Sequence, residues 1–258
     1  KSELDYVNEC DEVLKKSILS RTLSDVPIGA FLSSGVDSAL ITALIKSHTN
    51  KKVNTFTLGY EGKFDDETKH AELISKQLNT NHNELSVNFE NIFETILDIP
   101  KSYSEPFADS SQIPTMLISK FAKKKVSVVL TGDGADEIFG GYNRYVWIDR
   151  LSKISNINKK FLIILLNIIE KMSILGKDKY DTKLKIHKLI SILSSSDVQQ
   201  MYNLSIFYDY EKNLLKNDDL SQTNFFDFSN LNISNLNNIE KMMLTDTKYY
   251  LSDDILCK

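Results

Sequence analysis

Short apolar runs rich in β-branched residues alternate with helical periodicity over the first 145 residues of the chain. The strand patterns lie at 27–32, 53–58, 83–87 and 126–130, and helical patterns lie around them at 3–23, 38–48, 66–78, 89–98 and 111–124. This alternation is typical of an α/β fold built on a doubly wound parallel sheet.

After Tyr145 the strand signal fades, and apolar residues such as Trp147 and Leu151 recur at helical intervals. Residues 217–238 are rich in Asn, Ser and Asp, which predicts a loop or short helices. We therefore expect two domains: an α/β nucleotide-binding domain over 1–145, and a mainly helical region over 146–258.

Residues 31–38, Phe-Leu-Ser-Ser-Gly-Val-Asp-Ser, form a turn of small residues between the first strand pattern and the next helix. Such a turn gathers unpaired backbone N–H groups at the positive end of a helix dipole, which suits a phosphate or pyrophosphate. Gly35 allows close backbone approach, and Asp37 can hold Mg²⁺. The Lys of the kinase-type phosphate loop is absent, so we expect the turn to bind a pyrophosphate group. On this stretch alone, a turn that only caps a helix is the alternative.

The strand pattern at 126–130 also ends in a turn, at residues 131–137, which is rich in glycine and carboxylates. In a parallel sheet the carboxyl ends of the strands share one edge, where ligands bind. Asp37 and either Asp136 or Glu137 are therefore expected to meet around one Mg²⁺, which takes carboxylate and phosphate oxygens. An acidic, solvated turn is the alternative, but two such turns, each after an apolar strand, favour a functional site.

Residues 32–38 resemble the Ser-Gly-Gly-x-Asp-Ser loop of the ATP pyrophosphatases, and 131–142 resemble the second nucleotide loop of glutamine-hydrolysing asparagine synthetases. Residues 104–111 (SEPFADSS) and 252–256 (SDDIL) are also similar to that family. The resemblance implies a sheet of the ATP-pyrophosphatase type, with ATP and Mg²⁺ as cofactors.

The chemistry that this resemblance implies is amidation of a carboxylate, with aspartate as the usual acceptor and asparagine as the product. The substrate carboxylate attacks the α-phosphate of ATP, pyrophosphate leaves, and ammonia attacks the acyl-adenylate, which releases AMP. Asp133 would orient or deprotonate ammonia, and Asp136 would be the second catalytic residue and, with Asp37, a metal ligand. The candidate ATP-binding residues are Leu32, Ser33, Ser34, Gly35, Val36, Asp37, Ser38, Leu58, Gly59, Thr131 and Gly132.

Several further residues have weaker claims on a functional role. Leu58-Gly59 would contact adenine through its backbone by resemblance, or simply end a strand. His82 falls where the family often has His, but a strand-start histidine fits equally. Glu105 and Asp109 could line the acceptor pocket, and Asp109 could equally cap a helix. Tyr142 and Arg144 are expected to pack against the second loop.

The sequence departs from the family pattern at several positions. Ser34 replaces Gly, and its Cβ penalises a positive φ, which would shift the loop. Asp133 replaces the Glu of many asparagine synthetases, so another carboxylate acceptor, such as a sugar acid, stays open. The family's glutaminase domain normally lies N-terminal in the same chain with an amino-terminal Cys nucleophile, whereas residue 1 is Lys and Cys10 sits in a helical pattern. We expect a synthetase fragment, truncated at Lys258, that uses free ammonia.

Composition excludes some partners. The formal net charge of −4 gives no general attraction to nucleic acid, and the longest apolar run, 161–169, is too short for a membrane helix. Cys10 and Cys257 form no metal spacing, so we expect reduced thiols. With no signal peptide recognisable, we predict a cytoplasmic protein, and we leave a homodimer open.

Two other function classes fit the same loops. One is a different ATP pyrophosphatase, such as an NAD, GMP or argininosuccinate synthetase or a tRNA-modifying ligase. A tRNA-modifying ligase would be expected to have a basic face or Cys pairs, and the sequence shows neither clearly. The other is a non-catalytic nucleotide-binding module, which Ser34 and the expected truncation at Lys258 favour.

Overall fold

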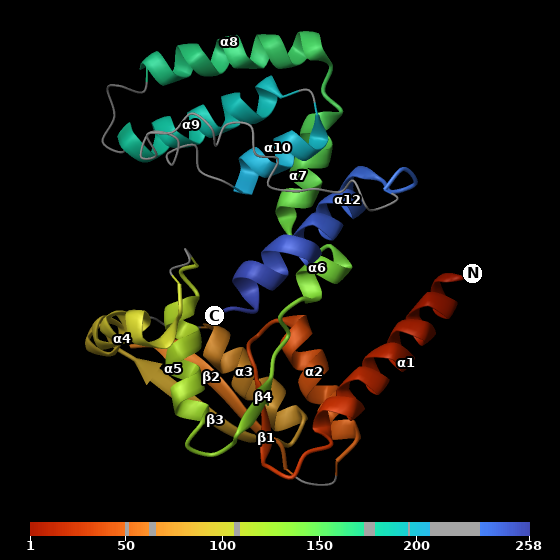
Figure 1. Cartoon of the computed structure of the whole chain (residues 1–258), viewed down its shortest axis with the longest axis vertical. Coiled ribbons are helices and arrows are strands. Elements are labelled where there is room, and N and C mark those ends of the chain that lie inside the picture. The colour runs from red at the N-terminus through yellow and green to blue at the C-terminus, as the bar shows by residue number, and fades with distance from the viewer. Residues whose placement is uncertain (50–51, 62–65, 106–108, 173–178, 196, 207–232) are drawn as a thin grey trace. The chain divides into compact units, whose positions relative to one another are not determined.

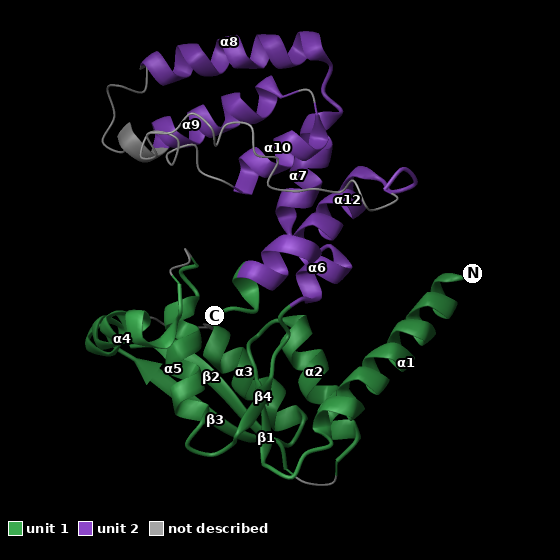
Figure 2. Cartoon of the chain, in the orientation of Figure 1, with its two compact units in different colours: residues 1–133, 254–258 green, residues 134–253 purple. Residues whose placement is uncertain are grey.

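The computed structural model describes residues 1–49, 52–61, 66–105, 109–172, 179–195, 197–206 and 233–258 (Figure 1). These residues form two compact units, residues 1–133 with 254–258 and residues 134–253 (Figure 2). The chain leaves the first unit at Asp133, within the second loop, and returns to it at Asp254. A domain boundary after Tyr145 stays a prediction, and most of the loop predicted at 217–238 lies outside the described residues.

The first unit is built on a sheet of four parallel strands in the order β3-β2-β1-β4. Ala30 of β1 pairs with Thr55 of β2 and Leu130 of β4, so β1 lies at the centre of the sheet. The strands are β1 (Ile28–Phe31), β2 (Asn54–Tyr60), β3 (Asn81–Val87) and β4 (Val128–Leu130). The helices of this unit are α1 (Glu3–Thr22), α2 (Val36–Ser47), α3 (Asp66–Gln77), α4 (Phe89–Ser102) and α5 (Gln112–Ala122).

Helices cover both faces of this sheet. Successive residues of a strand point to opposite faces, so neighbouring residues of β1 pack against different helices. Ala30 packs in one apolar cluster with Ile18 of α1 and Leu44 of α2. Its neighbour Phe31 packs in a second cluster, with Phe56 of β2 and residues of α5. The doubly wound α/β fold predicted from the alternating pattern is therefore confirmed.

The elements of the first unit agree closely with the predicted ranges, and α4 shows the clearest difference. The pattern predicts this helix to end at residue 98, ahead of Pro100, whereas the helix continues to Ser102. A proline lacks the N–H for one helical hydrogen bond, but the helix ends only two residues later, so a single bond is lost near its terminus.

The secondary-structure elements described in the second unit are all helices, in agreement with the predicted mainly helical region. Its helices are α6 (Ala135–Phe139), α7 (Asn143–Ser152), α8 (Asn156–Met172), α9 (Lys179–Ser194), α10 (Val198–Ile206), α12 (Asn238–Thr245) and most of the π-helical segment η3 (Asp246–Ile255). The core of this unit consists of Tyr145, Ile148, Ile192, Met201, Tyr202 and Met242. Within the described residues, no helix is long and apolar enough to cross a membrane.

Candidate functional site

The first loop leaves β1 at the centre of the sheet and is fixed at its base by β2. Leu32 is 2% exposed, its N–H donates to the Phe56 carbonyl at 2.9 Å, and its carbonyl accepts from the Thr57 hydroxyl. These bonds hold the start of the loop at the carboxyl edge of the sheet, where an α/β fold places its ligands.

Two serines close the loop on itself. The Ser38 hydroxyl accepts from the Ser33 backbone N–H at 3.0 Å and lies 2.9 Å from the Ser33 hydroxyl. The Ser33 hydroxyl also accepts from the Gly35 N–H at 3.1 Å. The loop is therefore pre-organised, so binding a phosphate would require little further ordering of the backbone.

The N-terminus of α2 is open. Gly35 is its N-cap without a side-chain cap, and Ser34, Val36 and Asp37 are exposed. Asn79 is the non-glycine residue with a positive φ among the described residues, so Ser34 adopts no such conformation. The expected penalty for serine in place of glycine is therefore absent from this loop.

The second loop approaches the first loop closely at one glycine. A Cβ added to Gly132 would lie 3.1 Å from the Asp37 Cβ and 3.1 Å from the Ser38 backbone nitrogen. Strands β1 and β4 are neighbours, so the loops that follow them share one edge of the sheet. The absence of a side chain at residue 132 lets the two loops meet.

Three carboxylates of the second loop lie in different surroundings. Asp133 is exposed, and its N–H donates to the Thr131 hydroxyl at 3.4 Å. Asp136 and Glu137 belong to α6 in the second unit, where Glu137 is only 1% exposed. Asp37 belongs to the first unit, so its pairing with Asp136 on one Mg²⁺ stays a prediction.

Gly59, near the end of β2, has a packing role of its own. A Cβ at this position would lie 2.6 Å from the Thr68 methyl group of α3, so only glycine fits beneath that helix. Gly59 is buried, and Leu58 is partly buried. The predicted backbone contact with adenine therefore stays a prediction beside this structural explanation.

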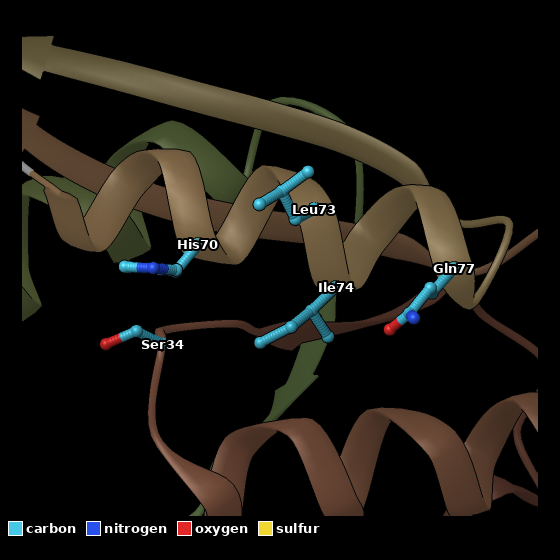
Figure 3. Close-up of a pocket in the computed structure, with 5 residues that line it drawn as sticks. All are labelled: Ser34, His70, Leu73, Ile74 and Gln77. Carbon is cyan, nitrogen blue, oxygen red and sulfur yellow. The ribbon is translucent and has the colours of Figure 1, made fainter.

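A hollow of about 650 Å³ opens beside the first loop (Figure 3). Figure 3 shows Ser34 of the loop facing one side of α3, and the lining residues are Ser34, His70, Leu73, Ile74 and Gln77. Its volume is within the range of small-molecule sites. Leu58 and Gly59 do not line it, so it is distinct from the adenine contact predicted at the end of β2.

Asp109 precedes Ser111, the N-cap of α5, and pairs with Lys258, for which the sequence pattern gives no signal. Its carboxylate accepts from the Ser111 N–H at 2.8 Å and from the Lys258 ammonium at 3.1 Å. Burial acts to raise the Asp109 pKa, but the bonds from Ser111 and Lys258 outweigh it and hold the pKa below its usual value. Nearby, burial and the Asp109 charge raise the pKa of Asp254. Of the similar stretch at 104–111, residues 106–108 lie outside the described residues, and Glu105 is exposed.

His82 has a structural position on β3. Its Nδ1 lies 3.1 Å from the Thr55 hydroxyl, and its Nε2 is buried without a hydrogen-bond partner among the described residues. Burial lowers its pKa, while the charges of Glu84 and Glu72 act in the opposite direction. These contacts tie neighbouring strands together.

The described residues hold no group of three or more His, Cys, Asp or Glu side chains that could bind a metal by themselves. Mg²⁺ commonly binds through one or two carboxylates together with substrate phosphates. Asp37, exposed in the first turn of α2 beside the first loop, offers the kind of oxygen donor that such a site needs. The residues present therefore fit a metal that arrives with a nucleotide.

Comparison with protein-family models gives a clear assignment. A model described as asparagine synthase matches residues 9–258, which is nearly the whole chain. The chain belongs to the asparagine synthase family. This family assignment agrees with the two loops and with the parallel sheet that positions them.

Curated relatives named as asparagine synthetases match about half of the chain. The chain is 41% identical over 138 residues to a putative glutamine-hydrolysing asparagine synthetase 2 of Methanocaldococcus jannaschii, covering 53% of this chain and 26% of that protein. It is 34% identical over 139 residues to asparagine synthetase 1 of Bacillus subtilis, covering 54% of this chain and 22% of that protein. The chain thus spans about a quarter of the length of these relatives.

Solved structures give more distant similarities. An ammonia-dependent NAD synthetase from Campylobacter jejuni has a TM-score of 0.38 at 14% identity, covering 71% of this chain and 93% of that chain. An NMN synthetase from Francisella tularensis has a TM-score of 0.36 at 18% identity, covering 56% and 60%. The fold assignment rests on the sheet and on the family model.

Proposed function

We propose that this chain carries out ATP-dependent amidation of a carboxylate, with aspartate as the acceptor and asparagine, AMP and pyrophosphate as products. The family assignment supports ATP-dependent ligase chemistry. The observation that carries the proposal is the approach of Gly132 to Asp37 and Ser38, which joins the two loops at the carboxyl edge of the sheet.

The first loop would bind the β- and γ-phosphates of ATP. Its hydroxyls and the open N-terminus of α2 offer donors to the phosphates, and its internal hydrogen bonds fix their directions. An oxygen of the substrate carboxylate attacks the α-phosphorus, and the bond from that phosphorus to the bridging oxygen breaks. Donors placed in advance stabilise the charge that develops on the leaving pyrophosphate.

Asp37 and Asp136 would hold Mg²⁺ against the phosphates. The metal, when bound, neutralises charge on the pyrophosphate. Both residues lie in the first turn of a helix with a glycine N-cap, Asp37 in α2 and Asp136 in α6, and Asp37 is exposed. These are properties that a ligand shared with a nucleotide requires.

Asp133 would act in the second half-reaction. Asp133 is exposed and follows Gly132 in the loop after β4, which ends at Leu130. Here it can accept a proton from the attacking ammonia as the new C–N bond forms and AMP leaves the acyl carbon. Asp133 is one methylene shorter than the Glu of many relatives, which favours testing a larger acceptor, such as a sugar acid, as the second candidate.

The test is to incubate the chain with ATP, Mg²⁺, ammonium and a panel of carboxylates, and to quantify AMP, ADP, pyrophosphate and phosphate. We expect AMP and pyrophosphate in equal amounts, with aspartate giving the fastest release. ADP and phosphate as the stoichiometric products would refute the proposal. Nucleotide binding without turnover of any carboxylate would identify a non-catalytic nucleotide-binding module.

Two variants separate the half-reactions. Asp37→Asn should abolish acceptor-dependent exchange between pyrophosphate and ATP. Asp133→Asn should preserve that exchange and lose amide formation. Asp25→Asn is the matched control, because Asp25 is exposed and precedes β1, so it lies toward the opposite edge of the sheet.

A further inference from the structure

Asp136 and Glu137 are consecutive carboxylates in α6, and their surroundings differ. Glu137 is 1% exposed, whereas Asp136 is only partly buried. Both belong to the second unit, within which the contacts below are made. The sequence offers either residue as a metal ligand, but the structure turns Glu137 into the core of its own unit.

Glu137 is held by a tyrosine in the turn that follows α6. The Tyr142 hydroxyl donates to the Glu137 Oε1 at 2.6 Å. Burial, and then this hydrogen bond to a carboxylate, raise the pKa of Tyr142, so its hydroxyl remains a proton donor at neutral pH. A short bond from a neutral donor to a buried carboxylate fixes α6 to the turn.

The same turn makes room for Asp136. A Cβ at Gly141 would lie 1.9 Å from the Asp136 Oδ1, so the carboxylate lies directly over this glycine. The Gly141 N–H donates to the Asp136 carbonyl at 3.0 Å, and Gly140 has a φ of 73°. Residues 140–142 therefore contact both carboxylates, Asp136 through Gly141 and Glu137 through Tyr142.

Tyr142 is itself fixed by Arg144. The guanidinium carbon of Arg144 lies 3.8 Å from the centre of the Tyr142 ring, within the range of a cation–π contact. The Arg144 Nη2 donates to the Asp246 Oδ2 at 2.6 Å, and its Nε donates to the Tyr202 hydroxyl at 2.9 Å. Asp246 is completely buried and also accepts from the Tyr145 hydroxyl at 2.7 Å. The support for the turn thus reaches α10 and η3.

We propose that Tyr142 and Arg144 are positioning residues that, through Glu137 and Gly141, hold the Asp136 carboxylate in the orientation needed to bind Mg²⁺ with the nucleotide. This inference rests on the proposed function, because that function makes Asp136 a metal ligand. In this proposal Glu137 has a structural role in the turn and is not a metal ligand.

The first experiment measures the Mg²⁺ concentration that gives half-maximal ATP binding by calorimetry, for wild type and variants of the 258-residue chain. Tyr142→Phe keeps the ring on Arg144 and removes the bond to Glu137. We expect it to raise this Mg²⁺ concentration about tenfold, a factor equivalent to the net free energy of one hydrogen bond. Glu137→Gln keeps an acceptor oxygen for Tyr142 and should stay within about twofold of wild type, a margin well below the loss of one hydrogen bond.

Ser195→Ala is the matched control for lost stability. The Ser195 hydroxyl is buried in the same unit and donates to the Gln200 Oε1 at 2.8 Å, away from the turn. It should lower the melting temperature, as Tyr142→Phe does, without changing the Mg²⁺ requirement. Equal shifts in the Tyr142→Phe and Ser195→Ala chains would overturn the proposal. So would a Glu137→Gln chain that needs as much Mg²⁺ as Asp136→Asn.

Hydrogen exchange of the nucleotide-free chain provides a test that does not depend on the proposed function. The Ile138 N–H donates to the Gly134 carbonyl, and the Gly141 N–H donates to the Asp136 carbonyl. Both amides should exchange faster in Tyr142→Phe than in Ser195→Ala, and equal rates would overturn the positioning role. A wild-type chain that shows no Mg²⁺-dependent ATP binding would instead refute the proposed function, whatever the exchange rates.

Discussion

Thr57→Val should weaken ATP binding by changing a residue that need not touch the nucleotide. The Thr57 side chain is 3% exposed, and its hydroxyl donates to the carbonyl of Leu32, where the first loop begins. Valine has nearly the same shape but no donor. The loss of this buried hydrogen bond should cost about 1–2 kcal/mol of the free energy of unfolding.

Thr55→Val is the matched control. Thr55 lies on the same strand and is completely buried, but its hydroxyl contacts the Thr80 hydroxyl at 3.0 Å and His82 at 3.1 Å, away from the first loop. Both variants should lose similar stability. Thr57→Val alone should lose about fivefold to tenfold in ATP affinity, because ordering of the loop would then be completed on binding.

The assay is calorimetric titration of Mg²⁺-ATP beside thermal unfolding of the three chains. Equal losses of ATP affinity in both valine variants would refute the role of Thr57, since the effect would then follow stability alone. So would a Thr57→Val chain that loses stability but binds ATP as tightly as wild type does. In that case the carbonyl of Leu32 would have no part in the conformation of the loop.

The surroundings of His82, Lys258 and Cys10 also lead to measurable effects. Burial lowers the pKa of His82 in the folded chain, so the unfolded chain binds a proton first as the pH falls. Stability should therefore decrease as the pH drops below about 6.5. Melting temperatures between about pH 8 and 5.5 should show this decrease in wild type and a smaller one in His82→Gln. Lys258→Ala should lower the free energy of unfolding by about 2–4 kcal/mol, because it leaves the Asp109 carboxylate without its cation. It should also speed hydrogen exchange of the backbone amides in residues 254–258. Unchanged stability would mean that the ion pair is not formed. Cys10 lies half-buried in α1, so the chain should release no glutamate from glutamine. Glutamate release by the chain, whether or not it survives Cys10→Ala, would contradict this prediction.

The sequence by itself determined the parallel α/β sheet and the two loops at its edge. Each strand and helix carries its own periodicity, and each loop has small or acidic residues directly after an apolar strand, so these features can be read locally. The family resemblance could be recognised for the same reason. At α4 the sequence pattern predicted the helix to end at residue 98, which is too early. Pro100 removes only one hydrogen bond near the end of the helix, so the helix continues to Ser102.

The tertiary structure decided which polar side chains support these loops. Glu137 and Asp136 are adjacent acidic residues in the sequence, and only packing shows that one is buried against Tyr142. The close fit at Gly132 likewise depends on β4 lying beside β1, which the order of elements along the chain does not fix.

Pairs that are distant in sequence were invisible to local patterns. Lys258 and Asp109 are separated by 149 positions, and Arg144 and Asp246 by 102. A charged residue looks the same in the sequence whether its side chain is solvated or paired in a core. Its partner is chosen by the folded backbone, because desolvation makes a buried charge stable only where packing brings a hydrogen-bonded counter-charge to it.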